Sequence, residues 1–214
     1  MMKNYGIPVA AEGWPFIIPL VLVTALLFAF GWKSMGFASL ALTLFVLFFF
    51  RDPDRTVPQG KGIVVSPADG RVIVIKDIYE PDYLKQNVKQ ISIFLSVFNV
   101  HVNRAPLGGA IDLVQYNPGK FHVASVDKAS LDNEQTAMVI TNGKHKVLVK
   151  QIAGLIARRI VCYAKTGDTL TAGERYGLIR FGSRVDIFLP RDAELAVSVG
   201  DRVKGARDVI GVLK

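Results

Sequence analysis

Cysteine is nearly absent from this sequence of 214 residues, which contains only Cys162. A lone cysteine excludes an internal disulfide, and Cys162 has neither a CxxC motif nor Cys/His neighbours that would indicate a metal site. We therefore expect no bound metal, and we expect Cys162 to be a buried thiol on a strand. The sequence also lacks a recognisable glycine-rich nucleotide loop and a convincing lysine motif for pyridoxal phosphate (PLP), so neither cofactor is expected.

Acidic residues are outnumbered by basic ones, and the formal net charge is +8. A basic balance suits either nucleic acid or an anionic membrane surface. No basic cluster interleaved with aromatic residues is present. The sequence therefore favours a membrane and predicts no nucleic-acid partner.

Charge is missing from two long hydrophobic segments, residues 14–32 and 35–50, with Lys33 between them. A membrane-spanning helix needs about 20 apolar residues, which the first segment just reaches and the second does not. Buried core helices are the alternative, but such helices normally keep a polar face, and these segments have almost none. We predict a membrane anchor at residues 1–50, either a transmembrane helical hairpin or one spanning helix with a partly inserted partner.

The basic residues around the anchor predict its orientation. Lys3 precedes it, and Arg51, Arg55 and Lys61 follow it. Because cytoplasmic flanks carry the excess of lysine and arginine, both ends of the hairpin and the following domain are expected on the cytoplasmic side of the cell membrane. Residues 51–62, which are charged and contain two prolines and two glycines, are interpreted as a linker.

Residues 63–214 predict a mainly β domain, because short apolar runs alternate with turn signals and no long segment has helical periodicity. Residues 136–154 indicate a hairpin with Asn142-Gly143 at its tip, typical of a type I′ turn. A weak repeat relates residues 167–179 to residues 200–213, and both stretches resemble hairpins of the lipoyl and biotinyl carrier fold. We expect a barrel-sandwich-like β domain behind the helical hairpin.

The first candidate for chemistry is the Gly182-Ser183 pair, which lies between two strand-like runs. Most such pairs are simple turns. This pair nevertheless has what backbone self-cleavage requires, because the Ser183 hydroxyl can attack the preceding carbonyl and Gly182 has no side chain to block the attack. Elimination at the Ser183 α-carbon would release the upstream chain. The dehydroalanine that remains hydrolyses to a pyruvoyl group and ammonia.

His101 and Asp69 are two further candidates. His101 lies near the end of an apolar run, where reactive groups usually sit, although a histidine among strand residues is more often structural. Asp69 precedes a glycine and is first of all a turn residue. If both meet Ser183, His101 can shuttle protons, and Asp69 can fix its tautomer and stabilise its cation, as in a Ser–His–Asp triad. The spacing alone does not require that the three meet.

Six motifs together resemble the short-form phosphatidylserine decarboxylases, which are pyruvoyl-dependent and include archaetidylserine decarboxylase-like proteins. The motifs run in the family's order from about residue 64 to 189 and are SPADG, FLSVFNVHVNRAP, YNPGKF, DKASLDNEQ, GLIARRIVC and RFGSRVDIFLP. RFGS followed by RVD is the most specific of them, and the N-terminal hydrophobic pair also fits this group.

The resemblance implies that the chain decarboxylates phosphatidylserine to phosphatidylethanolamine and CO2, through a Schiff base to a pyruvoyl group derived from Ser183. It places the self-cleavage between Gly182 and Ser183, and the processing histidine and aspartate at His101 and Asp69. Residues 63–214 are then the catalytic domain. The two fragments are expected to stay associated, while association of processed units into a homo-oligomer is left open.

One departure concerns the substrate. Long-form relatives carry a further histidine three residues before the processing one, and here that place is held by Phe98. Phe98, Lys120 and Arg104 are candidate substrate-binding residues, the two basic ones for the lipid phosphate, although solvated surface charge explains them equally well. Two alternatives remain: a membrane-anchored serine hydrolase that uses the same serine, histidine and aspartate, and a non-enzymatic tethered carrier-like adaptor. The lipid backbone, diacylglycerol or archaeal ether, is also open.

Overall fold

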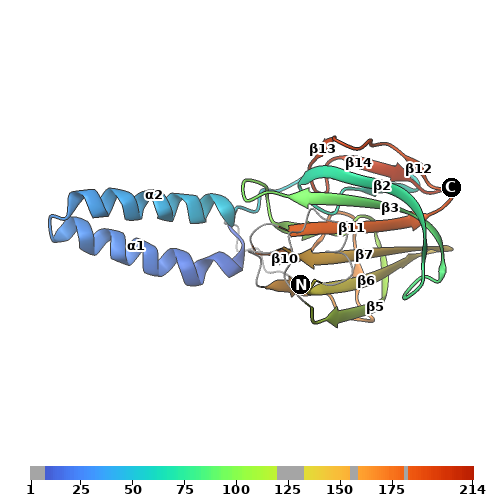
Figure 1. Cartoon of the computed structure of the whole chain (residues 1–214), viewed down its shortest axis with the longest axis horizontal. Coiled ribbons are helices and arrows are strands. Elements are labelled where there is room, and N and C mark those ends of the chain that lie inside the picture. Colours follow the sequence, from blue (N-terminus) through green and yellow to red (C-terminus); the bar gives the residue numbers. More distant parts are fainter. Residues whose placement is uncertain (1–7, 120–132, 155–158, 181–182) are drawn as a thin grey trace. The chain divides into compact units, whose positions relative to one another are not determined.

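The computed structural model describes residues 8–119, 133–154, 159–180 and 183–214. The chain divides into two compact units, Met2–Asp54 and Arg55–Lys214. The first unit is helical and the second is built of strands (Figure 1). The functional limits expected from the sequence, an anchor at 1–50, a linker at 51–62 and a catalytic domain at 63–214, stay predictions.

The helical unit is a hairpin. Its elements are η1 (Ala11–Gly13), α1 (Trp14–Ala29) and α2 (Lys33–Phe49). Between the two helices, Thr24 Oγ1 lies 2.7 Å from Ser39 Oγ and 3.3 Å from Thr43 Oγ1. At the open end, the backbone N–H of Ala10 donates to the carbonyl of Phe50 at 2.7 Å. The hydroxyl groups of Thr24, Ser39 and Thr43 are therefore satisfied inside the hairpin.

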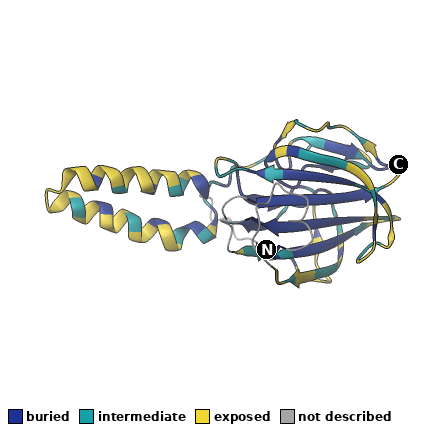
Figure 2. Cartoon of the chain, in the orientation of Figure 1, coloured by how far each residue is buried: buried dark blue, intermediate teal, exposed yellow. Residues whose placement is uncertain are grey.

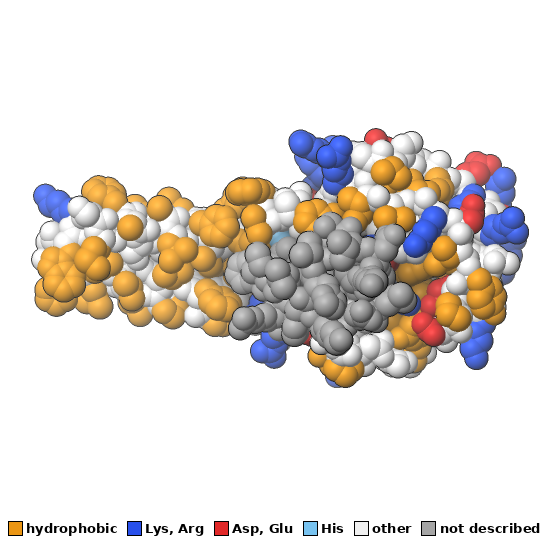
Figure 3. All heavy atoms as spheres, viewed as in Figure 1, with side chains coloured by type: hydrophobic (Ala, Val, Ile, Leu, Met, Phe, Trp, Pro, Cys, Tyr) orange, Lys and Arg blue, Asp and Glu red, His pale blue; other side chains and the backbone are white. Residues whose placement is uncertain are grey.

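Hydrophobic side chains cover the outside of this hairpin (Figure 3). Phe30 and Phe37, for example, are 70% and 63% exposed. Contiguous apolar surface of this kind marks a contact with a membrane or another protein. The continuous helix Ala11–Ala29, 19 residues long, is long and apolar enough to cross a membrane, whereas α2 is shorter. The structure thus contains the two helices that the sequence predicts, and one of them has the length of a membrane span.

The second unit is mainly β, as predicted. Eight strands form one curled antiparallel sheet in the order β13-β2-β3-β11-β7-β6-β5-β9, and two small sheets have the orders β1-β14-β12 and β4-β10-β8 (Figure 1). The strands are β1 (Ile63–Val65), β2 (Gly70–Glu80), β3 (Gln86–Leu95), β4 (Val102–Arg104), β5 (Gly109–Asn117), β6 (Gln135–Asn142), β7 (His145–Ala153), β8 (Ile160–Cys162), β9 (Thr169–Leu170), β10 (Arg175–Ile179), β11 (Ser183–Pro190), β12 (Glu194–Leu195), β13 (Arg202–Val203) and β14 (Val209–Val212).

The strand unit is internally duplicated about the central pair β11 and β7. On one side of this pair the sheet continues as β3, β2 and β13, and on the other side as β6, β5 and β9. The irregularities repeat as well: the β2–β3 register shifts between Val72 and Val74, and the β5–β6 register shifts between Ile111 and Leu113. The two small sheets correspond in the same way, so each half of the unit contains one copy of a single framework.

The weak sequence repeat, residues 167–179 and 200–213, lies at equivalent places of the duplicated strand unit. Gly167 and Gly200 donate backbone hydrogen bonds to equivalent carbonyls of β5 and β2, at 2.9 and 2.8 Å. The residues that follow them, Asp168 and Asp201, each accept the backbone N–H three positions earlier with their carboxylates, at 2.9 and 2.8 Å. Because one turn chemistry recurs at equivalent places, the repeat in the sequence reflects a repeat in the structure.

Strands β6 and β7 form the predicted hairpin, but the predicted type I′ turn is wrong. Asn142 pairs with His145, so the two loop residues are Gly143 and Lys144. A type I′ turn needs a positive φ at both loop residues, and here only Gly143 has one, at 59°. The pairing of Asn142 into the ladder therefore moves the turn one residue along the chain.

Candidate active site

Ser183 is the first residue of β11, at the centre of the large sheet (Figure 1). It pairs with Leu95 of β3 on one side and with Ala153 of β7 on the other. Side chains alternate across a sheet, so Val185 and Ile187 share the face of Ser183. All residues of β11 except the last are buried, as Figure 2 shows, so this strand is fixed at both edges and covered on both faces.

The Ser183 side chain is buried at the start of β11. Within the part of the chain that the structure describes, its Oγ has no partner. An unpaired buried hydroxyl costs about 1–3 kcal/mol, and most buried hydroxyls are therefore hydrogen-bonded. This orphaned oxygen among apolar neighbours fits a serine that is converted to a pyruvoyl group. Gly182, the other half of the predicted cleavage site, lies outside the described residues.

His101 is brought close to the segment that leads into Ser183. It lies just before β4, is 2% exposed, and accepts the backbone N–H of Ile179 with its carbonyl at 3.3 Å. Ile179 precedes Ser183 by four residues, so their Cα atoms are at most about 14 Å apart. The carbonyl oxygen of Asn99 lies 3.0 Å from His101 Nδ1. When Nδ1 carries the proton toward this carbonyl, Nε2 is the basic nitrogen.

Asp69 lies at the same end of the sheet, immediately before β2, and is 8% exposed. Its Oδ1 accepts the backbone N–H of Gly205 at 2.7 Å, and its Oδ2 pairs with Arg55 Nη2 at 2.9 Å. Strand β3 separates the start of β2 from the start of β11, which places the backbones of Asp69 and Ser183 roughly 10 Å apart. Both carboxylate oxygens are thus held in place by groups other than His101.

A buried charged network follows Ser183 on the opposite face of β11, and the sequence analysis gave it no role. Arg184 Nε pairs with Asp186 Oδ1 at 2.6 Å, and Arg184 Nη2 donates to Ser92 Oγ at 2.7 Å. Gln90 Nε2 donates to Asp186 Oδ2 at 3.0 Å. Removing one partner of such a buried pair costs about 3–5 kcal/mol. The two charges of the otherwise apolar run RVDIFLP were the signal that could have revealed it.

Two buried amides on the Ser183 face were also missed. Gln151 pairs with Val185, two residues beyond Ser183, and its Nε2 donates to Asn103 Oδ1 at 2.8 Å. A Cβ on Gly177 would lie 3.0 Å from that Nε2 and 2.2 Å from a backbone carbonyl of β8, so glycine leaves the space that the amides need. This pair supplies neutral hydrogen-bonding groups to an otherwise apolar face.

The three candidate substrate-binding residues, Phe98, Arg104 and Lys120, differ in their surroundings. Phe98 is 65% exposed. Arg104 is buried, and its Nη1 donates to the carbonyl of Gly173 at 3.3 Å, which ties the guanidinium into the domain. Lys120 lies outside the described residues. The substrate-binding roles of these three residues therefore stay predictions.

Cys162 is half-buried at the end of β8 rather than fully buried. Desolvation raises the pKa of its thiol to about 11, so the sulfur is protonated near neutral pH and is a poor nucleophile. Among the described residues, no group of three or more histidine, cysteine, aspartate or glutamate side chains could hold a metal ion. Ser183 is thus the better candidate for covalent chemistry.

Comparison with known proteins covers the whole chain. The family described as phosphatidylserine decarboxylase matches residues 42–211. The phosphatidylserine decarboxylase proenzymes of Geotalea uraniireducens and Syntrophotalea carbinolica are 47% identical over 213 residues and 49% identical over 215 residues, covering 99% and 100% of this chain and 100% of each relative. The proenzyme of Desulfotalea psychrophila is 47% identical over 211 residues, covering 98% of this chain and 99% of its own. This chain belongs to the phosphatidylserine decarboxylase family.

Proposed function

We infer that the chain is made as a proenzyme, cleaves itself between Gly182 and Ser183, and decarboxylates phosphatidylserine to phosphatidylethanolamine with the pyruvoyl group formed from Ser183. The reaction rests on membership of the family along the full length of the chain. The assignment of the site rests on one observation, the buried Ser183 hydroxyl that lacks a hydrogen bond within the described residues.

For self-cleavage, Ser183 needs a base, and the charge that develops must be stabilised. We assign the base to His101, because the Asn99 carbonyl beside Nδ1 leaves Nε2 to accept the serine proton. Asp69 acts through its charge, since both of its oxygens are already bonded to other groups. A carboxylate that comes within about 4–6 Å of the imidazole would favour the cationic histidine that forms when the serine proton is taken.

The first prediction concerns the cut itself. The wild-type protein should run on a denaturing gel as fragments 1–182 and 183–214, and Ser183→Ala should remain one chain. The small fragment should resist Edman sequencing, because a pyruvoyl terminus has no amine. Both fragments should co-elute in native gel filtration, because β11 pairs with β3 and β7 of the large fragment. A fully active preparation of intact chain would contradict self-cleavage and favour a serine hydrolase.

The second prediction concerns the proton relay. His101→Ala and Asp69→Ala should leave mostly uncut precursor, with processing slowed by about 100-fold or more, because each removes part of the activation of Ser183. Asp69→Asn should also be impaired, since it keeps the shape and loses the charge. Asp77→Asn, at an exposed position on β2, is the matched control and should be processed normally. Densitometry of the gel over time measures the rates, and normal cleavage in both alanine variants would show that the assigned residues are wrong.

For decarboxylation, the pyruvoyl group supplies a sink for the electrons left when CO2 departs. The chain excludes water from position 183, because Leu95, Ala153 and Val185 surround Ser183 with apolar side chains. The side chain of Phe98 cannot donate a proton. His101 or a water molecule is left to return the proton that replaces the carboxylate.

The third prediction concerns the reaction. The purified protein should convert phosphatidylserine to phosphatidylethanolamine and CO2 with no added cofactor. Borohydride added with labelled phosphatidylserine should fix the label on fragment 183–214, as mass spectrometry would show, and Ser183→Ala should take up no label. A requirement for added PLP, or label on a lysine elsewhere, would rule out the pyruvoyl mechanism even if the substrate were right.

We propose that α1 and α2 form a transmembrane hairpin in the cell membrane and that the strand unit, barrel-sandwich-like in its two halves, faces the cytoplasm. The exposed apolar surface of the helices supports this placement, and so do the hydroxyl contacts that satisfy Thr24 inside the hairpin. Lys33, at the turn, can extend its ammonium group to the lipid head groups. The hairpin thereby keeps the enzyme at the surface where its two-chain substrate resides.

The fourth prediction concerns this anchor. Deleting residues 1–50 should release the protein from the membrane fraction and leave self-cleavage intact, because Ser183, His101 and Asp69 all belong to the strand unit. Activity on phosphatidylserine in bilayers should fall by more than activity on a short-chain analogue dispersed in detergent. Equal losses on both substrates would mean that the helices shape the active site and do not merely anchor it.

A further inference from the structure

The duplication of the strand unit repeats the framework of the Ser183 site at a second place. At the Ser183 site, the N–H of Ile179, at the end of β10, donates to the carbonyl of His101, just before β4. At the second place, the N–H of Leu213, just after β14, donates to the carbonyl of Gly62, just before β1. Because β4 pairs with β10 as β1 pairs with β14, Gly62 occupies the position equivalent to His101.

The other two catalytic positions have counterparts as well. Asp69 and Gly108 are equivalent, because each is followed by a glycine that begins a long strand and whose Cβ would lie 2.3 Å from a carbonyl of the neighbouring strand. Ser183 and His145 are equivalent, because they begin the two central strands β11 and β7. The second place therefore keeps the backbone of the active site, with Gly62, Gly108 and His145 where the first has histidine, aspartate and serine.

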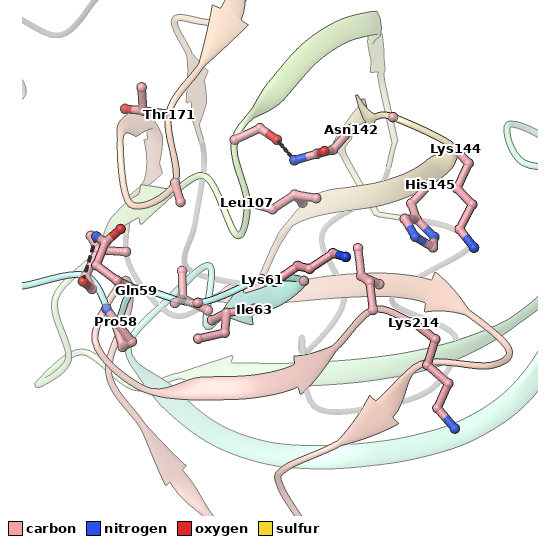
Figure 4. A pocket seen from close by; sticks show the side chains of 18 residues that line it. Pro58, Gln59, Lys61, Ile63, Leu107, Asn142, Lys144, His145, Thr171 and Lys214 are labelled. Carbon is pink, nitrogen blue, oxygen red and sulfur yellow. Dashed lines mark hydrogen bonds between the residues drawn. The ribbon is translucent and has the colours of Figure 1, made fainter.

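This second place is a cavity of about 640 Å³ (Figure 4). Figure 4 shows the Lys61 side chain extending toward the side of the cavity on which Lys144, His145 and Lys214 lie. None of its lining residues is acidic. Lys214 pairs with Glu194 at 2.8 Å, which offsets its charge, so Lys61 and Lys144 supply the positive charge of the cavity. The lining also contains apolar residues, among them Val57, Ile63, Val65, Leu107 and Leu213.

We propose that this cavity is a second, non-catalytic site that binds a phosphate ester carried by an amphiphile, such as the head group of an anionic phospholipid. Lysine ammonium groups are strong phosphate donors, and the apolar wall can receive the adjoining hydrocarbon. The cavity has the size of ordinary ligand pockets, which hold roughly 300–1,000 Å³. Glycine at position 108 matters, because the aspartate of the equivalent position would repel an anion. Without a serine and its base, a lipid bound here is not processed.

Titration calorimetry on the full chain in detergent tests this proposal. The probes are dihexanoyl phosphatidylglycerol, glycerol 3-phosphate and inorganic phosphate, and the first has no amine with which to enter the decarboxylation. The double variant Lys61→Gln/Lys144→Gln is compared with Lys76→Gln/Lys165→Gln, which removes the same charge at exposed positions outside the cavity. We expect the Kd for phosphatidylglycerol to rise about tenfold in the first variant and by less than about twofold in the second.

A second pair of variants tests the replaced acid. A Cβ on Gly108 would lie 3.4 Å from its nearest neighbour, which is an ordinary contact distance, so the position has room for a Cβ. Gly108→Asp should weaken binding about tenfold relative to Gly108→Asn, which has the same shape without the charge.

Binding of phosphatidylglycerol that is tighter than binding of glycerol 3-phosphate or inorganic phosphate supports the proposal, whereas equal binding of either small probe would show that the apolar wall takes no part and would overturn the amphiphile as ligand. Binding of none of the probes would overturn it, and so would equal affinities in the two lysine double variants. The readout is affinity, so a failure of self-cleavage or decarboxylation would be detected separately, on the gel and in the lipid assay.

Discussion

The pairing of β11 on both edges is the constraint on which the rest of the site depends. Ser183 begins this strand, with β3 on one side and β7 on the other, and Arg184 and Asp186 anchor the opposite face to Ser92. A chain end created at an edge strand would fray, because its backbone groups could bond to water instead. A chain end created here keeps its ladder on both sides. If the proposed cleavage takes place here, the group that it forms would therefore stay in a dry and ordered setting.

Local patterns were enough to predict the two helices and the mainly β domain, because hydrophobic length and periodicity are properties of short segments. The turn of the β6–β7 hairpin could not be predicted in the same way. Asn142-Gly143 favours a type I′ turn by itself, but the ladder pairs Asn142 with His145 and makes Gly143 and Lys144 the loop. Register is set by the whole face of a strand packed against the core, and that outranks the preference of one dipeptide.

Motifs identified the candidate site, but its contacts lie far apart in sequence. Asp69 is 14 residues from Arg55 and 136 residues from Gly205, the two groups that bond its carboxylate. Arg184 is 92 residues from Ser92. No spacing rule reaches across such distances, since the strand order decides which segments meet. The sequence could therefore suggest which residues react, whereas the groups that fix their orientation became visible only with the sheet topology.

The duplicated framework separates what the fold supplies from what the side chains supply. The Ser183 site and its counterpart both offer the end of a central strand and the same backbone hydrogen bonds around it, yet only the first carries a serine, a histidine and an aspartate. The two places also differ in access to solvent. Ser183 is fully buried, whereas its counterpart His145 is half-buried beside an open cavity. Because a charged ligand has to enter from water or from a lipid surface, the open copy of the framework is suited to binding as it stands, whereas the closed copy suits the proposed self-cleavage, in which both reacting groups belong to the chain.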